Sequence, residues 1–126
     1  MKHYSAQDFY ETISMLRLSF AHDGRSLLVS QDATKIFNAC SIDISNGEFT
    51  PLTQSSSESI YIVSCFPHDN RFLFSKDYCG NEQFHLFVQA LNGDAVEITP
   101  GDNLVAEFMQ WHENKESFWI KTKVRA

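Results

Sequence analysis

An internal repeat of about 46 residues constrains this chain more than any other feature of its sequence. Aromatic residues that end an apolar run and precede a polar turn stand at Phe20, Phe66 and Trp111, at intervals of 46 and 45 residues. Two further markers recur at an interval of 46 residues, namely Asn46-Gly47 with Asn92-Gly93 and Leu52-Thr53 with Ile98-Thr99. Three markers in one register predict a repeat protein in which each copy is one structural unit.

Within each copy, the apolar residues alternate with polar ones at the period that is typical of β-strands. Asp-Gly and Asn-Gly pairs separate the runs, and they favour tight hairpin turns because they tolerate positive φ. The predicted strands are Met15–Phe20, Leu27–Ser30, Ile36–Ile44, Phe49–Thr53, Ile60–Phe66, Phe72–Lys76, Phe84–Leu91, Val96–Thr99, Ala106–Trp111 and Ser117–Lys121. Four antiparallel strands in each complete copy predict the blades of a β-propeller.

The fold class predicted is all-β, a β-propeller segment of four-stranded antiparallel blades with a short N-terminal helix and a ring that is not closed. The boundaries are a helical lead-in over 1–14, a first blade over 15–53, a second over 54–99 and half of a third over 100–126. Ser5-Ala6-Gln7-Asp8 has capping-box spacing, which predicts the helix over 6–13. A partial stack leaves an apolar edge, so we expect it to be completed by missing blades of a parent chain or by other copies of itself.

The composition disfavours several classes of partner. The net charge is −6 and no two Lys or Arg residues are adjacent, so neither nucleic acid nor an anionic membrane is expected to bind. No apolar run approaches the roughly 18 residues of a membrane helix, and the first residues lack the apolar core of a signal peptide. Cys40, Cys65 and Cys79 show no metal or redox spacing, so we expect reduced thiols and a cytoplasmic location.

Several stretches resemble one family of propellers. The turn Phe20–Arg25 looks like the aromatic-Ser-Pro-Asp-Gly-Lys/Arg turn of TolB-like propellers, which include those of the prolyl oligopeptidase family of serine peptidases (acylaminoacyl-peptidase and dipeptidyl-peptidase branch). Residues 76–87 are similar to the family's Asp-x-x-Gly-Asp-Glu-Asn-x-x-Leu-Tyr stretch, and residues 91–101 resemble its Asp-Gly-Gly…Leu-Thr-Pro-Gly ending. Asp8-Phe9-Tyr10 is similar to the family's opening helix. The usual Ser-Pro is replaced by Ala21-His22, Pro67-His68 and His112-Glu113.

The resemblance implies a propeller segment that restricts entry of substrate to a separate α/β-hydrolase domain of the parent chain. The nucleophile elbow Gly-x-Ser-x-Gly of such hydrolases does not occur here, because Leu28 stands where Gly24-Arg25-Ser26 would need a second glycine. We therefore expect no catalysis by this chain alone, and no cofactor. Two alternatives stay open: a TolB-like or WD-like propeller segment that serves as a protein-binding scaffold, and an inactive truncated remnant.

Acidic loops give the candidate binding face. In a meander, the loops after the second strand of each blade and the connections between blades emerge at one end, with Asp32 among their residues. The candidate binding residues there are Asp77, Asn81, Glu82, Glu58, Asp102 and Glu107. Carboxylates on long loops can attract a peptide amine, and Glu82 and Asp77 are the first candidates. The alternative is a solvated acidic rim.

Histidines in the repeated turns suggest a metal site, but the repeat argues against it. Equivalent positions of His22, His68 and His112 lie one blade apart, and facing sheets are already about 10 Å apart, whereas ligands lie about 2 Å from one ion. We interpret these histidines as turn residues and predict no metal. The aromatic residues could suggest a nucleic-acid platform, but we interpret them as core between blades; they are Phe66, Phe72, Phe74, Phe84, Phe87, Trp111, Phe118 and Trp119.

Overall fold

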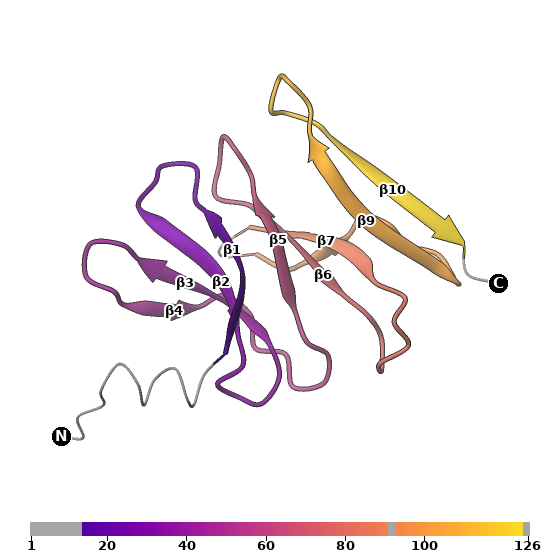
Figure 1. Ribbon diagram of the computed structural model, residues 1–126, viewed down its shortest axis with the longest axis horizontal. Helices are drawn as coiled ribbons and strands as arrows, with labels where there is room; N and C mark the ends of the chain where they lie inside the picture. Colours follow the sequence, from indigo (N-terminus) through magenta and orange to yellow (C-terminus); the bar gives the residue numbers. More distant parts are fainter. Residues whose placement is uncertain (1–13, 91–92, 125–126) are drawn as a thin grey trace.

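The computed structural model describes residues 14–90 and 93–124, which form three antiparallel sheets (Figure 1). The first sheet has the order β1 (Met15–Phe20), β2 (Ser26–Gln31), β3 (Asn38–Asp43) and β4 (Phe49–Pro51). The second has the order β5 (Tyr61–Cys65), β6 (Phe72–Lys76), β7 (His85–Gln89) and β8 (Val96–Glu97). The third pairs β9 (Leu104–Trp111) with β10 (Phe118–Val124). The predicted all-β class and the four-stranded antiparallel meanders are confirmed.

The sequence also predicted a short N-terminal helix and a propeller ring that is not closed. The described residues contain no helix, and the helix predicted over 6–13 lies outside them and is not confirmed. No described helix is therefore long and apolar enough to cross a membrane. The three sheets fan out side by side without closing a ring over the described part of the chain (Figure 1).

The sheets pack face to face, and serine hydroxyls join them. The backbone N–H of Ile62 donates to Ser30 Oγ at 2.7 Å, and that of Cys65 donates to Ser19 Oγ at 2.9 Å. These bonds run from β5 to the first sheet. The corresponding bond to the third sheet runs from Trp111 Nε1 to Ser64 Oγ at 2.9 Å. Each serine hydroxyl accepts a hydrogen bond from an N–H group that would otherwise have no acceptor between the two sheets.

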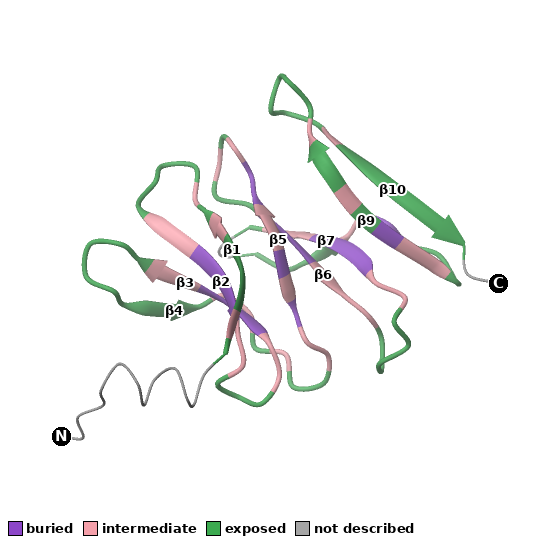
Figure 2. Ribbon diagram, viewed as in Figure 1, coloured by how far each residue is buried: buried purple, intermediate pink, exposed green. Residues whose placement is uncertain are grey.

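The core lies between the first two sheets. Buried residues concentrate on β2, β3, β6 and β7, with further ones on β5 (Figure 2). The cluster comprises Leu28, Ala39, Ile60, Ile62, Cys65, Phe72, Phe74 and Phe87. Its centre is aromatic: Phe74 is 1% exposed and its ring stacks on that of Phe87, with centroids 5.1 Å apart. Core packing of this kind is what holds neighbouring blades of a repeat together.

A second aromatic group lies between the second and third sheets. Phe66 meets Trp111 edge-on, with ring centroids 5.0 Å apart, and Trp111 meets Phe118 at 5.1 Å. Phe108 joins both of these β9–β10 rings. Trp119, which the sequence also suggested as core, is instead 57% exposed. It neighbours Phe118 in β10, and successive residues of a strand point to opposite faces of the sheet.

Each innermost strand carries a β-bulge at the same place in the repeat. In β1, Arg17 and Leu18 together oppose one residue of β2. Val63 is the extra residue of β5, and Met109 is that of β9. The exposed apolar side chains of Leu18 and Met109 therefore mark bulges on the free inner edges. Bulges increase local twist and protect edges from pairing with other chains.

The turn geometry corrects the register of the first aromatic marker. The first turn of each blade closes with a backbone bond from Ala21 to Ser26, from Phe66 to Arg71 and from His112 to Ser117. Phe66 thus corresponds to Ala21 and His112, and not to Phe20 and Trp111. It lies one residue beyond β5, and the guanidinium carbon of Arg71 is 4.2 Å from the centroid of its ring.

Candidate functional site

A repeated polar clamp ties each complete blade to the next. At the start of β3, Asn38 Oδ1 accepts the N–H of Ser55 at 2.8 Å, and its Nδ2 donates to the Ser55 carbonyl at 3.0 Å. Thr53 Oγ1 accepts the N–H of Ala39 at 2.9 Å. In the second blade, Thr99 Oγ1 accepts the N–H of Leu86 at the same distance. The Leu-Thr and Ile-Thr markers thus recur because their threonines satisfy buried donors.

His85 takes the place of Asn38 in the second blade. Its side chain is 6% exposed, its Nδ1 contacts a Glu97 carboxylate oxygen, and its Nε2 lies 2.9 Å from the carbonyl oxygen of Leu104. Both ring nitrogens therefore contact oxygen atoms of other residues. Because Leu104 begins β9, His85 connects the second blade to the third sheet.

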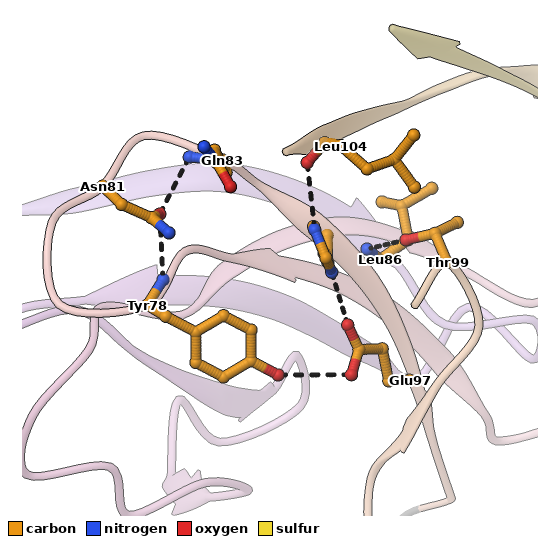
Figure 3. A network of polar contacts seen from close by, with 8 residues as sticks. Tyr78, Asn81, Gln83, Leu86, Glu97, Thr99 and Leu104 are labelled. Carbon is orange, nitrogen blue, oxygen red and sulfur yellow. Dashed lines mark hydrogen bonds and ion pairs between the residues drawn. The ribbon is translucent and has the colours of Figure 1, made fainter. Parts of the chain in front are cut away.

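Glu97 extends this network to the loop that follows β6. Its second carboxylate oxygen accepts the hydroxyl of Tyr78 at 3.2 Å (Figure 3). Partial burial and the Glu97 carboxylate both raise the pKa of Tyr78, and Glu58 adds to the effect through its charge. Glu58 and Glu97 therefore lie at the same end of the molecule, although they come from different blades. The Tyr78 hydroxyl therefore stays protonated and donates its hydrogen bond to Glu97.

The loop itself is ordered by its own acidic and amide side chains. Asn81 Oδ1 accepts the backbone N–H groups of Tyr78 and Gln83, at 3.3 and 2.9 Å (Figure 3). Asp77 Oδ2 accepts the N–H of Glu82 at 3.0 Å. Two of the predicted binding residues, Asp77 and Asn81, thus each use one side-chain oxygen to satisfy backbone donors of the loop.

A polar hollow of about 360 Å³ lies at this end of the second blade. It is lined by Tyr78, Asn81, Gln83, His85, Glu97, Gly101 and Asp102. Of the predicted binding residues it brings together Asn81 and Asp102. Sequence reasoning missed His85, Glu97 and Tyr78; the aligned clamp position, Asn in one blade and His in the next, is the signal that could have found them.

The remaining predicted residues lie elsewhere. Glu82 lines a neighbouring surface depression with Phe84, Val105 and Lys123. Glu58 is half-buried in the connection between the first two blades, and its carboxylate accepts the hydroxyl of Ser57. Glu107 is not a loop residue: it lies within β9, opposite Lys121 of β10.

The first blade has a hollow at the equivalent place, with different chemistry. It is lined by Gln31, Thr34, Ile36, Asn38, Pro51, Thr53, Gln54, Ser55 and Ser56. The position of Glu97 on the last strand is taken there by Pro51, since Pro51 opposes Cys40 as Glu97 opposes Phe87. No carboxylate lines this first hollow. Of the two complete blades, only the second has carboxylates in the lining of this hollow.

The histidines of the repeated turns and the cysteines do not form a site in the described residues. His22, His68 and His112 lie in three separate turns, and His22 Nε2 contacts Asn70 Oδ1 at 3.0 Å. No group of three His, Cys, Asp or Glu side chains in the described part of the chain could hold a metal ion. Burial raises the pKa of the Cys40 and Cys65 thiols, which disfavours the reactive thiolate.

Comparisons with known proteins bear on the fold. No protein-family model and no curated protein sequence matches the chain. Among solved structures, it is similar to TolB from Acinetobacter baumannii, with a TM-score of 0.58 and 12% sequence identity. The likeness covers 74% of this chain and 26% of that chain, so it spans about a quarter of the TolB structure. At this identity the likeness concerns the fold alone, and the chain has the fold of a segment of a TolB-like β-propeller.

Proposed function

We propose that this chain is a non-catalytic propeller segment that acts as a binding scaffold, and that the hollow of the second blade holds the amino end of a peptide. The observation that carries the proposal is the contrast between the two equivalent hollows. Both have the same position on a blade, but only the second places carboxylates, from Glu97 and Asp102, in its lining.

The charges of the second hollow suit an ammonium group. Glu97 is already engaged by His85 and Tyr78, so it contributes negative potential and a fixed position. Asp102 is exposed, and its carboxylate has no hydrogen bond or ion pair within residues 14–90 and 93–124. A charged amine donates stronger hydrogen bonds to a carboxylate than a neutral amide does. Asp102 would therefore be the main partner of the amine.

An NMR titration tests this function. The probe is the tripeptide Gly-Gly-Phe, added to the 15N-labelled chain with a free or an acetylated amino end. We expect the free amine to shift the backbone signals of Gln83, Gly101 and Asp102, and to leave those of Ser55 and Ser56 in the first hollow unchanged. Equal shifts with the acetylated peptide would contradict an amine site.

A matched pair of variants separates the site from general acidity. Asp102→Asn removes the carboxylate of the hollow, whereas Asp94→Asn makes the same change on an exposed residue outside its lining. The shifts should disappear in the first variant and persist in the second. Loss in both variants, or in neither, would count against Asp102.

The gating role in a prolyl-oligopeptidase-like serine peptidase is the second candidate. It is favoured by the motif-like stretch over residues 76–87, because that stretch supplies one wall of the hollow. The catalytic groups would then belong to a separate α/β-hydrolase domain, and the chain would be a cytoplasmic gate. Reading the coding sequence beyond the codon for residue 126 tests this role. Further repeats followed by Gly-x-Ser-x-Gly would support the gate, and an immediate stop codon would contradict it.

A further inference from the structure

A crevice of about 290 Å³ lies between the second and third sheets. Its floor is apolar, because Leu86 of β7 is 1% exposed and Ala106 of β9 is 4% exposed. Half-buried apolar side chains form its walls; they are Val63, Phe84, Val105 and Phe108. Pockets for drug-sized ligands begin at about 300 Å³. The crevice therefore suits a single small molecule with an apolar group.

Two exposed residues of opposite charge also line this crevice, Arg17 of β1 and Glu107 of β9. They do not form an ion pair with one another, and neither forms one with any other residue of the described part of the chain. Ser75 adds a half-buried hydroxyl group to the lining. The crevice thus combines an apolar interior with one guanidinium group and one carboxylate.

Arg17 departs from the pattern of the repeat. Counted back four residues from the residue that closes each first turn, its equivalents are Ile62 and Phe108. Ile62 has Phe74 as its ladder partner, and Phe108 has Ile120. Arg17 has no ladder partner, because it lies in the bulge of β1. Its φ is 59°, a left-handed conformation that residues other than glycine rarely adopt, and neither equivalent has a positive φ.

The side chain of Arg17 reaches from the first blade to the second. Its guanidinium carbon lies 5.9 Å from the ring centroid of Tyr61, at the start of β5. That ring meets Phe84 of the crevice at 6.0 Å. Bulges re-aim side chains beside functional sites, and residues with strained backbones cluster at ligand sites. A position that is apolar in the other two copies thus supplies a cation to the crevice.

A ligand with a single charge would fit this lining poorly. A carboxylate beside Arg17 would also experience the like charge of Glu107, and an amine beside Glu107 would experience that of Arg17. A ligand with both charges gives each residue a partner of opposite sign, and hydrogen bonds between charged groups are the stronger ones. An apolar side chain on the same ligand would bury the remaining surface of the crevice.

We propose that the crevice binds a free amino acid with an apolar side chain. The carboxylate of the ligand contacts Arg17, its ammonium group contacts Glu107, and its side chain packs on Leu86 and Ala106. The crevice shares no lining residue with the hollow of the second blade. The proposal is therefore independent of the proposed function.

An NMR titration of the 15N-labelled 126-residue chain tests the proposal with three probes. They are L-phenylalanine, its amide, which lacks the carboxylate, and its N-acetyl derivative, which lacks the ammonium group. Each derivative should bind about tenfold more weakly, because it loses one charge-assisted contact. L-phenylalanine should shift the backbone signals of Val63, Val105 and Phe108. Equal affinity of the three probes, no binding of L-phenylalanine, or shifts confined to the hollow of the second blade would overturn the proposal.

Variants assign each charge of the ligand to its partner. Arg17→Gln should remove the advantage of L-phenylalanine over its amide, and Glu107→Gln should remove its advantage over the N-acetyl derivative. Arg25→Gln and Glu113→Gln are the matched controls, since they make the same changes on exposed residues outside the lining.

Both controls should keep both advantages, and so should Asp102→Asn, which alters only the hollow of the second blade. Circular dichroism verifies that each variant is folded, and the comparison of the three probes on the native chain does not depend on any variant. A variant of Arg17 or Glu107 that weakens all three probes equally would contradict the assigned contact.

Discussion

Replacing Thr99 by valine probes the clamp that the repeat uses twice. Valine keeps the shape of threonine but removes the hydroxyl oxygen that accepts the N–H of Leu86 at 2.9 Å. Thr99 is 5% exposed and Leu86 1%, so water cannot replace the lost acceptor without opening the blade. Leaving one buried donor unsatisfied costs about 1–3 kcal/mol. We expect the free energy of unfolding to fall by that amount.

Thermal and urea unfolding measure this change. An entropy of unfolding of roughly 2.1 cal/mol/K per residue gives about 0.26 kcal/mol/K for 126 residues. A loss of 1–3 kcal/mol therefore lowers Tm by about 4–11 °C. The fluorescence of Trp111 is a suitable probe, because its ring lies between the second and third sheets.

Thr122→Val is the matched control, since Thr122 is an exposed residue of β10 and the substitution is the same. We expect a change within about 0.5 kcal/mol, as is usual for surface positions. Equal stability of the two variants would refute the reasoning, because it would mean that the Leu86 donor finds another acceptor at no cost. The Thr-containing markers would then need a different explanation.

Three other predictions address the core and the ionisable groups. Phe74→Ala removes a ring that is 1% exposed and stacked in the core, so urea unfolding should show a loss of about 3–5 kcal/mol, and a loss below 1 kcal/mol would contradict the packing. The Arg71 side chain donates to Asp69 and lowers its pKa, so its small stabilisation is present above the unfolded pKa of about 3.9 and lost as the pH falls further. The stability difference between the native chain and Asp69→Asn should therefore vanish in acid and stay below about 1 kcal/mol at neutral pH, since both groups are half-exposed. In an NMR titration, Tyr78 should deprotonate above the ordinary tyrosine value of about 10, and Glu97→Gln should reduce this shift without abolishing it, because burial is its larger cause.

The strands and their pairing could be predicted from the sequence because both follow local rules. Alternation of apolar residues locates a strand, and residues such as Gly24 and Gly47, both at positive φ, locate the turns. Sheet order follows because consecutive antiparallel strands joined by short turns pair with one another. The overall β-propeller class needed only these signals and the interval of the repeat.

The bulges could not be predicted in the same way. A bulge is a relation between two strands, and the extra residue can be placed only when the ladder is known. Val63 and Met109 look like ordinary strand residues in a pattern of alternation. Phe20 was aligned with Phe66 for a similar reason. The alignment matched the two aromatic residues, whereas the backbone hydrogen bonds of the turns show that Phe66 corresponds to Ala21, one residue after Phe20.

The candidate site was predicted only in part because its residues belong to a network across loops and strands. Asp77 and Asn81 lie in the expected loop, but their oxygens satisfy its backbone. Glu107 was assigned to the loop face although it lies within the predicted strand Ala106–Trp111, and it lies within β9 in the structure. Side-chain direction and hydrogen-bond partners are set by tertiary contacts, which no single stretch of sequence contains.

The clamp position shows how a structural role and a candidate site arise from one substitution between repeats. Asn38 satisfies its connection without charge, and the residue of its blade that corresponds to Glu97 is Pro51. With His85 in the same place, a carboxylate becomes favourable at Glu97, and that carboxylate in turn orders Tyr78. The histidine therefore serves the same joint between blades while adding an acidic partner to the hollow. The same position of the repeat thus gives the second blade a chemistry that the first blade lacks.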